Sequence, residues 1–358
     1  MAKTFIIAEA GVNHNGSLEM AVQLIDAAVE AGTDAVKFQT FKADNLVTRN
    51  AAKAEYQNKT TDSNETQYEM IKKLELDEEA HQYLINYCKN KGIEFLSTPF
   101  DHDSVDLLVQ TFNLSQIKVS SGDLTNAPLL LQIAQTGKPI IISTGMSNLS
   151  EIEQALSVLA FGYMNNQEQP SIRAFELAYS SEAGQSALRK NVTILHCTTE
   201  YPAPFAEVNL RAMDTLKQAF GLTVGFSDHT PGIAIPVAAV ARGAMVIEKH
   251  FTLDRTLPGP DHKASLEPNE LKLMVQSIRQ VEMALGSTIK RPADSEHKNM
   301  EIARKSILAS KPIFKGQKFS EENLMIKRPG DGVAPIHYWS LLGREADTDY
   351  EAAEPVRL

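Results

Sequence analysis

The sequence predicts an α/β fold: a closed (β/α)8 TIM barrel followed by a small β-rich C-terminal domain. Eight short apolar runs alternate with amphipathic helical stretches, and this alternation is typical of a closed parallel barrel. Each run also ends in polar, chemically capable residues, and active sites form at the carboxyl ends of barrel strands. The predicted strands are 4–11, 35–40, 95–100, 116–123, 140–146, 192–198, 223–229 and 245–251.

The first predicted strand leads into a helix with clear start and stop signals. Ser17 is suited to cap the first turn, and Gly32 lies just past the end, where a C′ glycine is expected. The next strand follows within a few residues, so the connections of this βαβ unit are short. The expected apolar face of the helix consists of Leu18, Val22, Ile25, Ala28 and Val29.

Two segments are too long for simple turns. The polar segment 41–74 follows the second strand, and long loops at that end of a barrel usually cover the substrate. The segment 161–191 precedes the sixth strand, so it belongs to the opposite end and is expected to be peripheral.

The last barrel helix is expected at 269–286, which sets the first domain at 1–286. Residues 287–303 are charged and low in apolar content, so they are interpreted as a linker. Residues 304–358 contain short β-like pieces with Gly/Pro turns and form the second predicted domain. A segment of this size is marginal as an independent domain, so it should dock on the barrel or on a partner chain.

Composition restricts the class of protein. The chain has 358 residues, is 43% hydrophobic and carries a formal net charge of −10, with no Lys/Arg-rich block. That balance argues against a nucleic-acid partner. Two cysteines, Cys88 and Cys197, form no disulfide framework and suit a reducing compartment. With no signal peptide and no apolar stretch near the ~20 residues that span a bilayer, a cytoplasmic protein without a membrane partner is expected.

Two histidines end neighbouring predicted strands and suggest a metal site. Side chains two apart on a strand share a face, so Ser227 points with His229, and Glu248 with His250. Two imidazoles with water or carboxylate oxygens suit Mn²⁺, Fe²⁺, Zn²⁺ or Co²⁺, and open positions would let the metal polarise a carbonyl. The alternative for either histidine is a hydrogen-bonded structural residue.

Lysines near the ends of the second and fourth strands form a second group. Lys37, beside Gln39, and Lys118 need partners if buried, because a desolvated charge is costly. With the hydroxyls of Ser121 and Ser143 they suit a phosphate or a carboxylate. A Schiff-base lysine and a simple ion pair with a carboxylate remain open alternatives.

Three further residues are candidates on weaker signals. Glu9 ends the first strand and is interpreted either as a general base or substrate-orienting carboxylate, or as the counter-ion of a lysine. Cys197 follows His196 directly, so the two side chains face opposite ways and a packed cysteine is the better interpretation. In the tail, Arg328 lies before a Pro-Gly turn and could reach an acceptor on a neighbouring subunit.

Assembled, these residues resemble the sialic acid synthase family, which makes nonulosonic acids. The similarity runs nearly end to end, and the motifs in this order are highly specific. It rests on FIIAEAGVNHNGS, AVKFQTFKA, FLSTPFD, IKVSSGD, IIISTGM, LHCTTEYPAPFAEVNL, VGFSDHTPG, IEKHFTLDRTLPGPDHKASLEP, ARKSILA and NLMIKRPGDG.

The resemblance implies a barrel that condenses phosphoenolpyruvate with an N-acetylated hexosamine. It implies a divalent metal, Mn²⁺ before Mg²⁺ or Co²⁺, an antifreeze-like SAF domain as the tail, and a domain-swapped homodimer. Carried over, His229 and His250 resemble the metal ligands, and Arg328 the arginine that meets the sugar's N-acetyl group from the other subunit. The implied catalytic residues are Glu9, Lys37, Lys118 and Glu248. The implied substrate-binding residues are Gln39, Thr98, Ser121, Asp123, Ser143, Tyr201, Ser227, Asp261 and Arg328.

One position departs from the family pattern, and several functions remain open. The fourth-strand motif ends in Asp123 where the family normally has Glu. The acceptor is either N-acetylmannosamine, giving N-acetylneuraminate, or 2,4-diacetamido-2,4,6-trideoxymannose, giving diacetyllegionaminate. The other hypotheses are an octulosonate- or heptulosonate-type enolpyruvate-condensing barrel and a non-catalytic sugar-binding protein. The C-terminal domain disfavours the former, and the set of strand-end residues disfavours the latter.

Overall fold

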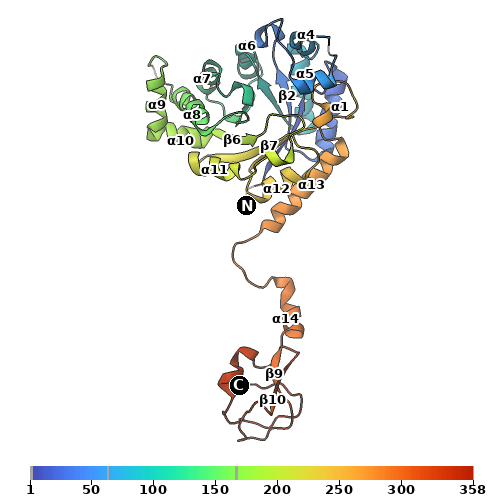
Figure 1. Ribbon diagram of the computed structural model, residues 1–358, viewed down its shortest axis with the longest axis vertical. Helices are drawn as coiled ribbons and strands as arrows, with labels where there is room; N and C mark the ends of the chain where they lie inside the picture. Colours follow the sequence, from blue (N-terminus) through green and yellow to red (C-terminus); the bar gives the residue numbers. More distant parts are fainter. Residues whose placement is uncertain (1–2, 63, 166–167, 358) are drawn as a thin grey trace. The chain divides into compact units, whose positions relative to one another are not determined.

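The computed structural model describes residues 3–62, 64–165 and 168–357. The chain divides into two compact units, Met1–Gly286 and Ser287–Leu358, and each is described by itself. Figure 1 labels the elements of both units. In neither unit is any described helix long and apolar enough to cross a membrane.

The first unit is the predicted TIM barrel. Its eight strands form one sheet in the order β3-β2-β1-β8-β7-β6-β5-β4, and every recorded pairing is parallel. The two outer members of this order, β3 and β4, also contact each other, so the sheet closes on itself. The strands are β1 Phe5–Gly11, β2 Ala35–Thr40, β3 Glu94–Pro99, β4 Ile117–Val119, β5 Ile140–Ser143, β6 Val192–Cys197, β7 Thr223–Asp228 and β8 Val246–His250.

Helices surround the strands, as Figure 1 shows for this unit. A helix follows each strand, and a large apolar core lies between the two layers. The surrounding helices are α1 Leu18–Ala31, α5 Glu78–Lys91, α6 His102–Asp106, α7 Ala127–Gln135, α8 Leu149–Tyr163, α11 Ala212–Phe220, α12 Ala234–Ala241 and α13 Pro268–Leu285.

The predicted caps of α1 are confirmed, but its predicted apolar face is partly wrong. The Ser17 side chain accepts a hydrogen bond from the Met20 amide, and Gly32 ends the helix with φ 79°. Leu18 is 38% exposed, whereas the helix buries a row that includes three alanines. Helix α1 packs between α5 and α13. The small side chains of its buried row let the helix lie close to the sheet. The buried residues are Ala21, Leu24, Ile25, Ala28 and Ala31.

Both long segments contain helices. Segment 41–74 forms α2 Ala43–Leu46, α3 Glu55–Thr60 and α4 Gln67–Lys72, held by a small apolar cluster of its own. Segment 161–191 completes α8 and adds α9 Ile172–Ser180 and α10 Glu182–Asn191, which pack against α8. Residues 166 and 167 of that segment lie outside the described residues.

The second unit has a separate small core. Strands β9 Ser306–Ala309 and β10 Leu324–Lys327 pair antiparallel, and the chain end adds to β9 because the Val356 amide donates to the Ile307 carbonyl. Two helices, α14 His297–Ala303 and α15 Tyr338–Leu341, belong to this unit. Helix α14 lies within the stretch interpreted as a linker. It has no buried residue, so no apolar pattern could have predicted it.

Candidate active site

The interior side chains of the barrel change from apolar to polar along the strands. The inner apolar layer consists of Ile7, Ala35, Leu96, Ile141, Leu195 and Val246. Two residues further along the same strands come Glu9, Lys37, Thr98, Ser143, Cys197 and Glu248. Side chains two apart share a face, so this second layer lies at the carboxyl end of the barrel interior. The apolar layer closes the barrel, and the polar layer opens into a cavity.

That cavity has a volume of about 370 Å³ and brings together most of the predicted site residues. Strand register explains why: Glu9 pairs with Lys37 on one side and with His250 on the other, so side chains from distant parts of the sequence meet at one height. The predicted residues that line the cavity are Glu9, Lys37, Gln39, Thr98, Lys118, Ser121, Ser143, Tyr201, Ser227, His229, Glu248 and His250.

Lys37 lies between two carboxylates. Its Nζ is 2.6 Å from Glu9 Oε2 and 3.7 Å from Glu248 Oε2, and it donates a hydrogen bond of 2.9 Å to Thr98 Oγ1. Burial disfavours the charged amine, but the carboxylates of Glu248 and Glu9 outweigh it and raise the pKa of Lys37. Lys37 is therefore a fixed cation in the cavity.

Lys118 is the second cation and has weaker support. Its Nζ donates to Ser143 Oγ at 2.7 Å and lies 3.4 Å from Glu248 Oε1. Burial lowers the pKa of Lys118, and the Glu248 carboxylate opposes that shift only partly. A bound anion would favour the charged form of Lys118, which burial disfavours.

The two carboxylates differ in protonation. Burial raises the pKa of Glu9 to about 7, with Lys37 opposing the shift. Burial acts on Glu248 in the same direction, but the ammonium groups of Lys118 and Lys37 dominate and lower its pKa to about 2. The Ser227 hydroxyl also donates to Glu248 Oε1 at 2.9 Å. Glu248 is thus a permanent anion, whereas Glu9 can exchange a proton near neutral pH.

The two predicted metal ligands lie side by side. The ring centroids of His229 and His250 are 5.6 Å apart. His229 Nδ1 donates to the Thr198 carbonyl at 2.6 Å, which leaves Nε2 with a free lone pair. His250 Nδ1 is buried, has no hydrogen-bond partner among the described residues, and is 3.9 Å from Asp261 Oδ2. Burial lowers the pKa of both imidazoles, which keeps them neutral as metal binding requires.

These histidines fit a divalent metal that takes its other ligands from substrate and water. Within the described part of the chain, no group of three or more His, Cys, Asp or Glu side chains is arranged to hold a metal ion. The orphaned Nδ1 of His250 is the observation that favours a missing partner, because buried polar atoms are rarely left unsatisfied. A carbonyl-fixed tautomer such as that of His229 is also usual for metal-ligating histidines.

Three predicted residues lie outside this cavity lining. Asp123 lies in a turn after β4, where its carboxylate accepts hydrogen bonds from Ser120 Oγ at 2.8 Å and Asn126 Nδ2 at 3.3 Å. Asp261 is buried beside His250 and lines an adjoining chamber of about 190 Å³; burial raises its pKa to about 6. Arg328 belongs to the second unit, at the turn after β10.

The cavity also contains residues that sequence reasoning missed. Tyr56 and Gln67 reach it from the 41–74 segment. Their only signal was the expectation that this segment covers the substrate. Thr199 and Met146 follow β6 and β5, so a stricter use of the strand-end rule would have included them. Cys197 also lines the cavity, with Sγ 3.1 Å from Ser121 Oγ, and burial raises the pKa of its thiol.

Residues on the alternate face of the same strands are structural, and Asp228 is an example. Its carboxylate is 2.6 Å from Lys249 Nζ, and both side chains are fully buried on the helix-facing side of β7 and β8. His196 likewise faces away from the cavity and bonds to the Val208 carbonyl at 2.7 Å. Alternate residues of the strands thus have different roles. Charged side chains facing the interior line the cavity, whereas Asp228 and Lys249 on the other face form a structural pair.

Comparison with known proteins agrees with this geometry. The chain is 53% identical over 357 residues to an N,N'-diacetyllegionaminic acid synthase of Campylobacter jejuni, with 100% of both chains covered. A synthase of the same name from Legionella pneumophila is 46% identical, covering 97% of this chain and 92% of the relative.

A solved structure is similar as well. The N-acetylneuraminic acid synthetase of Leptospira borgpetersenii, in complex with citrate, is 33% identical with a TM-score of 0.66, covering 84% of this chain and 90% of that chain. The SAF domain model matches residues 304–358. The NeuB family model matches residues 24–290, so the chain belongs to the NeuB family.

Proposed function

We propose that this enzyme is a nonulosonic acid synthase that condenses phosphoenolpyruvate, an N-acetylated mannosamine-type sugar and water to a nine-carbon acid and phosphate. It is then a carbon–carbon condensing transferase. The observation that carries the proposal is the pair of buried lysines, Lys37 and Lys118, beside a carboxylate of raised pKa and two neutral histidines in one cavity.

The lysine side of the cavity suits phosphoenolpyruvate. Its phosphate and carboxylate would meet the ammonium groups of Lys37 and Lys118 and the hydroxyls of Thr98, Ser121 and Ser143, which all line the same cavity. Both lysines already bond hydroxyls, which fixes their direction. Preorganised cations of this kind stabilise charge that develops on a leaving phosphate.

The histidine side suits the acceptor aldehyde. His229 and His250 would hold a divalent metal, Mn²⁺ before Mg²⁺ or Co²⁺, and when bound it would supply a Lewis acid for the carbonyl oxygen. Tyr201 packs over both imidazoles, with ring centroids 4.2 Å and 5.6 Å away, so it forms the wall against which a sugar chain lies.

The positions of these groups support the following reaction. Carbon 3 of phosphoenolpyruvate attacks the open-chain aldehyde carbon. The carbonyl π electrons move to the aldehyde oxygen, which becomes an alkoxide, and positive charge is left on carbon 2. Water adds to carbon 2, and Glu9, whose pKa of about 7 suits a base at neutral pH, takes its proton. The resulting phosphate hemiketal collapses: its hydroxyl proton passes to the phosphate as the carbon–oxygen bond to phosphate breaks. The proton that Glu9 took from water neutralises the alkoxide. Phosphate leaves toward Lys37 and Lys118, and the keto acid remains.

For the acceptor we propose 2,4-diacetamido-2,4,6-trideoxymannose in preference to N-acetylmannosamine. One wall of the chamber beside His250 is apolar and suits acetyl and 6-methyl groups better than hydroxyls. The two synthases that are 53% and 46% identical also carry the diacetyllegionaminate name. The apolar wall consists of Val12, Phe41, Leu46, Met70, Ile71, Leu74 and Phe100.

We further propose a domain-swapped homodimer in the cytoplasm, with Arg328 of one subunit meeting the acceptor's N-acetyl group in the other. Arg328 is exposed in the described unit, which leaves its guanidinium free for such a contact. Mixing Arg328→Ala with Lys37→Ala subunits, each inactive alone, should restore part of the activity. Failure of the mixture to regain activity would contradict the proposed domain-swapped dimer.

The test of the function is phosphate release from phosphoenolpyruvate with Mn²⁺, with the two sugars offered in parallel. We expect a higher kcat/KM with the diacetamido sugar. Preference for N-acetylmannosamine would make the enzyme an N-acetylneuraminate synthase with the same mechanism. Turnover that requires a phosphorylated aldose would favour the octulosonate-type alternative.

A further inference from the structure

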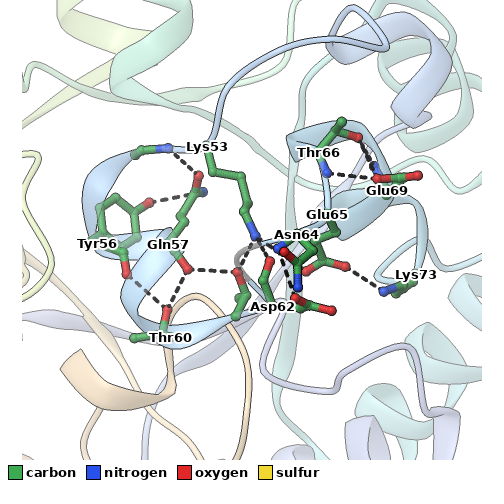
Figure 2. Close-up of polar contacts among 12 residues, drawn as sticks. Lys53, Tyr56, Gln57, Thr60, Asp62, Asn64, Glu65, Thr66, Glu69 and Lys73 are labelled. Carbon is green, nitrogen blue, oxygen red and sulfur yellow. Dashed lines mark hydrogen bonds and ion pairs between the residues drawn. The ribbon is translucent and has the colours of Figure 1, made fainter.

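A buried lysine outside the proposed catalytic set joins the two ends of a helix over the cavity. Lys53 precedes α3, and its side chain is 1% exposed. Its Nζ donates to Thr61 Oγ1 at 2.9 Å and to the Asp62 carbonyl, and it lies 3.7 Å from Glu65 Oε1. Figure 2 shows the Lys53 side chain pointing toward Asp62 and Glu65.

Burying an ammonium group is favourable only when its donors are satisfied. An ammonium has three donors, and here one group each of Thr61, Asp62 and Glu65 faces it. Because all three lie beyond the C-terminal end of α3, Lys53 ties the two ends of the helix together. Glu65 extends the tie to α4, since its Oε2 is 2.5 Å from Lys73 Nζ.

Helix α3 needs such support. It has six residues, well below the ~12–15 that an isolated helix needs in water. Its N-cap position is Ala54, whose side chain has no hydrogen-bonding group, and none of its described side chains is fully buried. The Thr61 hydroxyl, which accepts from Lys53, also donates to the Gln57 carbonyl in the last turn at 2.7 Å. The lysine therefore acts on the helix through a specific hydrogen-bond chain.

What α3 holds in place is one wall of the cavity. Tyr56, in its first turn, lines both the main cavity and the adjoining chamber. The Tyr56 ring is 5.1 Å from the Tyr201 ring, which in turn packs on His229 and His250. A shift of α3 would move Tyr56 away from the acceptor side of the cavity and leave the lysine side untouched.

We propose that Lys53 is a positioning residue for the acceptor: its network with Thr61, Asp62 and Glu65 fixes α3 so that Tyr56 closes the acceptor side. This rests on the proposed function, in which the acceptor is an N-acetylated sugar. The variant that tests it is Lys53→Met, which keeps most of the stem and removes the ammonium group. The matched control is Lys72→Met, because Lys72 lies in the same segment but is half exposed and pairs with Glu75.

The first measurement does not depend on activity. Amide hydrogen exchange of residues 51–66 in the substrate-free protein should become at least about tenfold faster in Lys53→Met, because local opening exposes helix amides. Lys72→Met should exchange like the unaltered protein. Equal exchange in Lys53→Met and the unaltered protein would overturn the proposal, whatever the substrate is.

The second measurement separates positioning from general loss of structure. Lys53→Met should raise the KM for the acceptor on the order of tenfold, as expected for a displaced binding wall, and leave the KM for phosphoenolpyruvate within about twofold. In a double-mutant cycle with Tyr56→Ala, the two effects on acceptor KM should be far from additive. Additive effects, or equal increases in both KM values, would overturn the proposal. Absence of turnover with any N-acetylated sugar in the unaltered enzyme would instead overturn the proposed function. The hydrogen-exchange result would still show whether Lys53 fixes α3.

Discussion

The strand-end layer and the 41–74 segment both line one cavity, but their side chains are held in place by different means. Residues such as Glu9, Lys37 and Glu248 are held by a parallel sheet, with their heights set by strand register. Tyr56 and Gln67 are held by short helices whose order depends on a buried lysine and a small apolar cluster. Under the proposed function, the labour is divided: the strand-end layer carries out the chemistry, and the 41–74 segment recognises the acceptor.

Loss of a proposed metal ligand should produce the largest effect on the strand-end side. His250→Ala is expected to lower kcat by about 10⁴-fold or more, because the polarisation of the acceptor carbonyl is removed. Phosphate release should be measured with added Mn²⁺ and after chelation. Full activity in the chelated variant would remove the metal assignment.

Glu9→Gln should have the second largest effect on kcat. We expect a decrease of about 10²–10⁴-fold, the usual contribution of a positioned base. Gln keeps the size of the side chain and loses the ionisable group. The KM for the acceptor should change little, because Glu9 lies on the lysine side of the cavity, 2.6 Å from Lys37. An unchanged kcat would show that another group accepts the proton.

The pH profile of the unaltered enzyme provides a second test of Glu9 as the base. Burial raises the pKa of Glu9 to about 7, so its basic form is present above pH 7 and is lost as the pH falls below it. We expect kcat to rise with pH through this value and Glu9→Gln to lack that limb. A limb that persists in the variant would assign the titration to another group.

Breaking the buried Asp228–Lys249 pair on the helix-facing side of the sheet should lower stability and leave kcat and KM unchanged. Lys249→Met leaves Asp228 buried without its partner, which is expected to reduce the free energy of unfolding by about 3–5 kcal/mol. Lys272→Met is the control, because its partially exposed pair with Glu30 is worth about 1 kcal/mol or less. Denaturant unfolding gives both values. Similar losses in the two variants would contradict the distinction.

The smallest effect is expected at Asp123. Its carboxylate is occupied by Ser120 and Asn126, so Asp123→Ala should lower stability by about 1 kcal/mol, the worth of such hydrogen bonds, and change kcat/KM less than about threefold. Steady-state kinetics with both substrates checks this. A loss of a hundredfold would mean that Asp123 contacts substrate directly, as the family resemblance implied.

Sequence patterns predict the strand-end side of the cavity far better than the side built by the 41–74 segment. Strand periodicity and the rule that side chains two apart share a face are local, so Lys37, His229 and His250 could be placed from the sequence alone. The family resemblance is confirmed by the match to residues 24–290. Tyr56 was missed because its position depends on contacts of Lys53 with Thr61, Asp62 and Glu65, which no local pattern encodes. Helix α14 was missed because it buries nothing.

The most direct test of this division is to compare Glu9→Gln with Tyr56→Ala in one steady-state experiment, varying phosphoenolpyruvate and the acceptor separately. We expect Glu9→Gln to lose kcat with little change in acceptor KM, whereas Tyr56→Ala should keep kcat within about threefold and raise acceptor KM about tenfold. A Tyr56→Ala enzyme that loses kcat and keeps its acceptor KM would contradict the account.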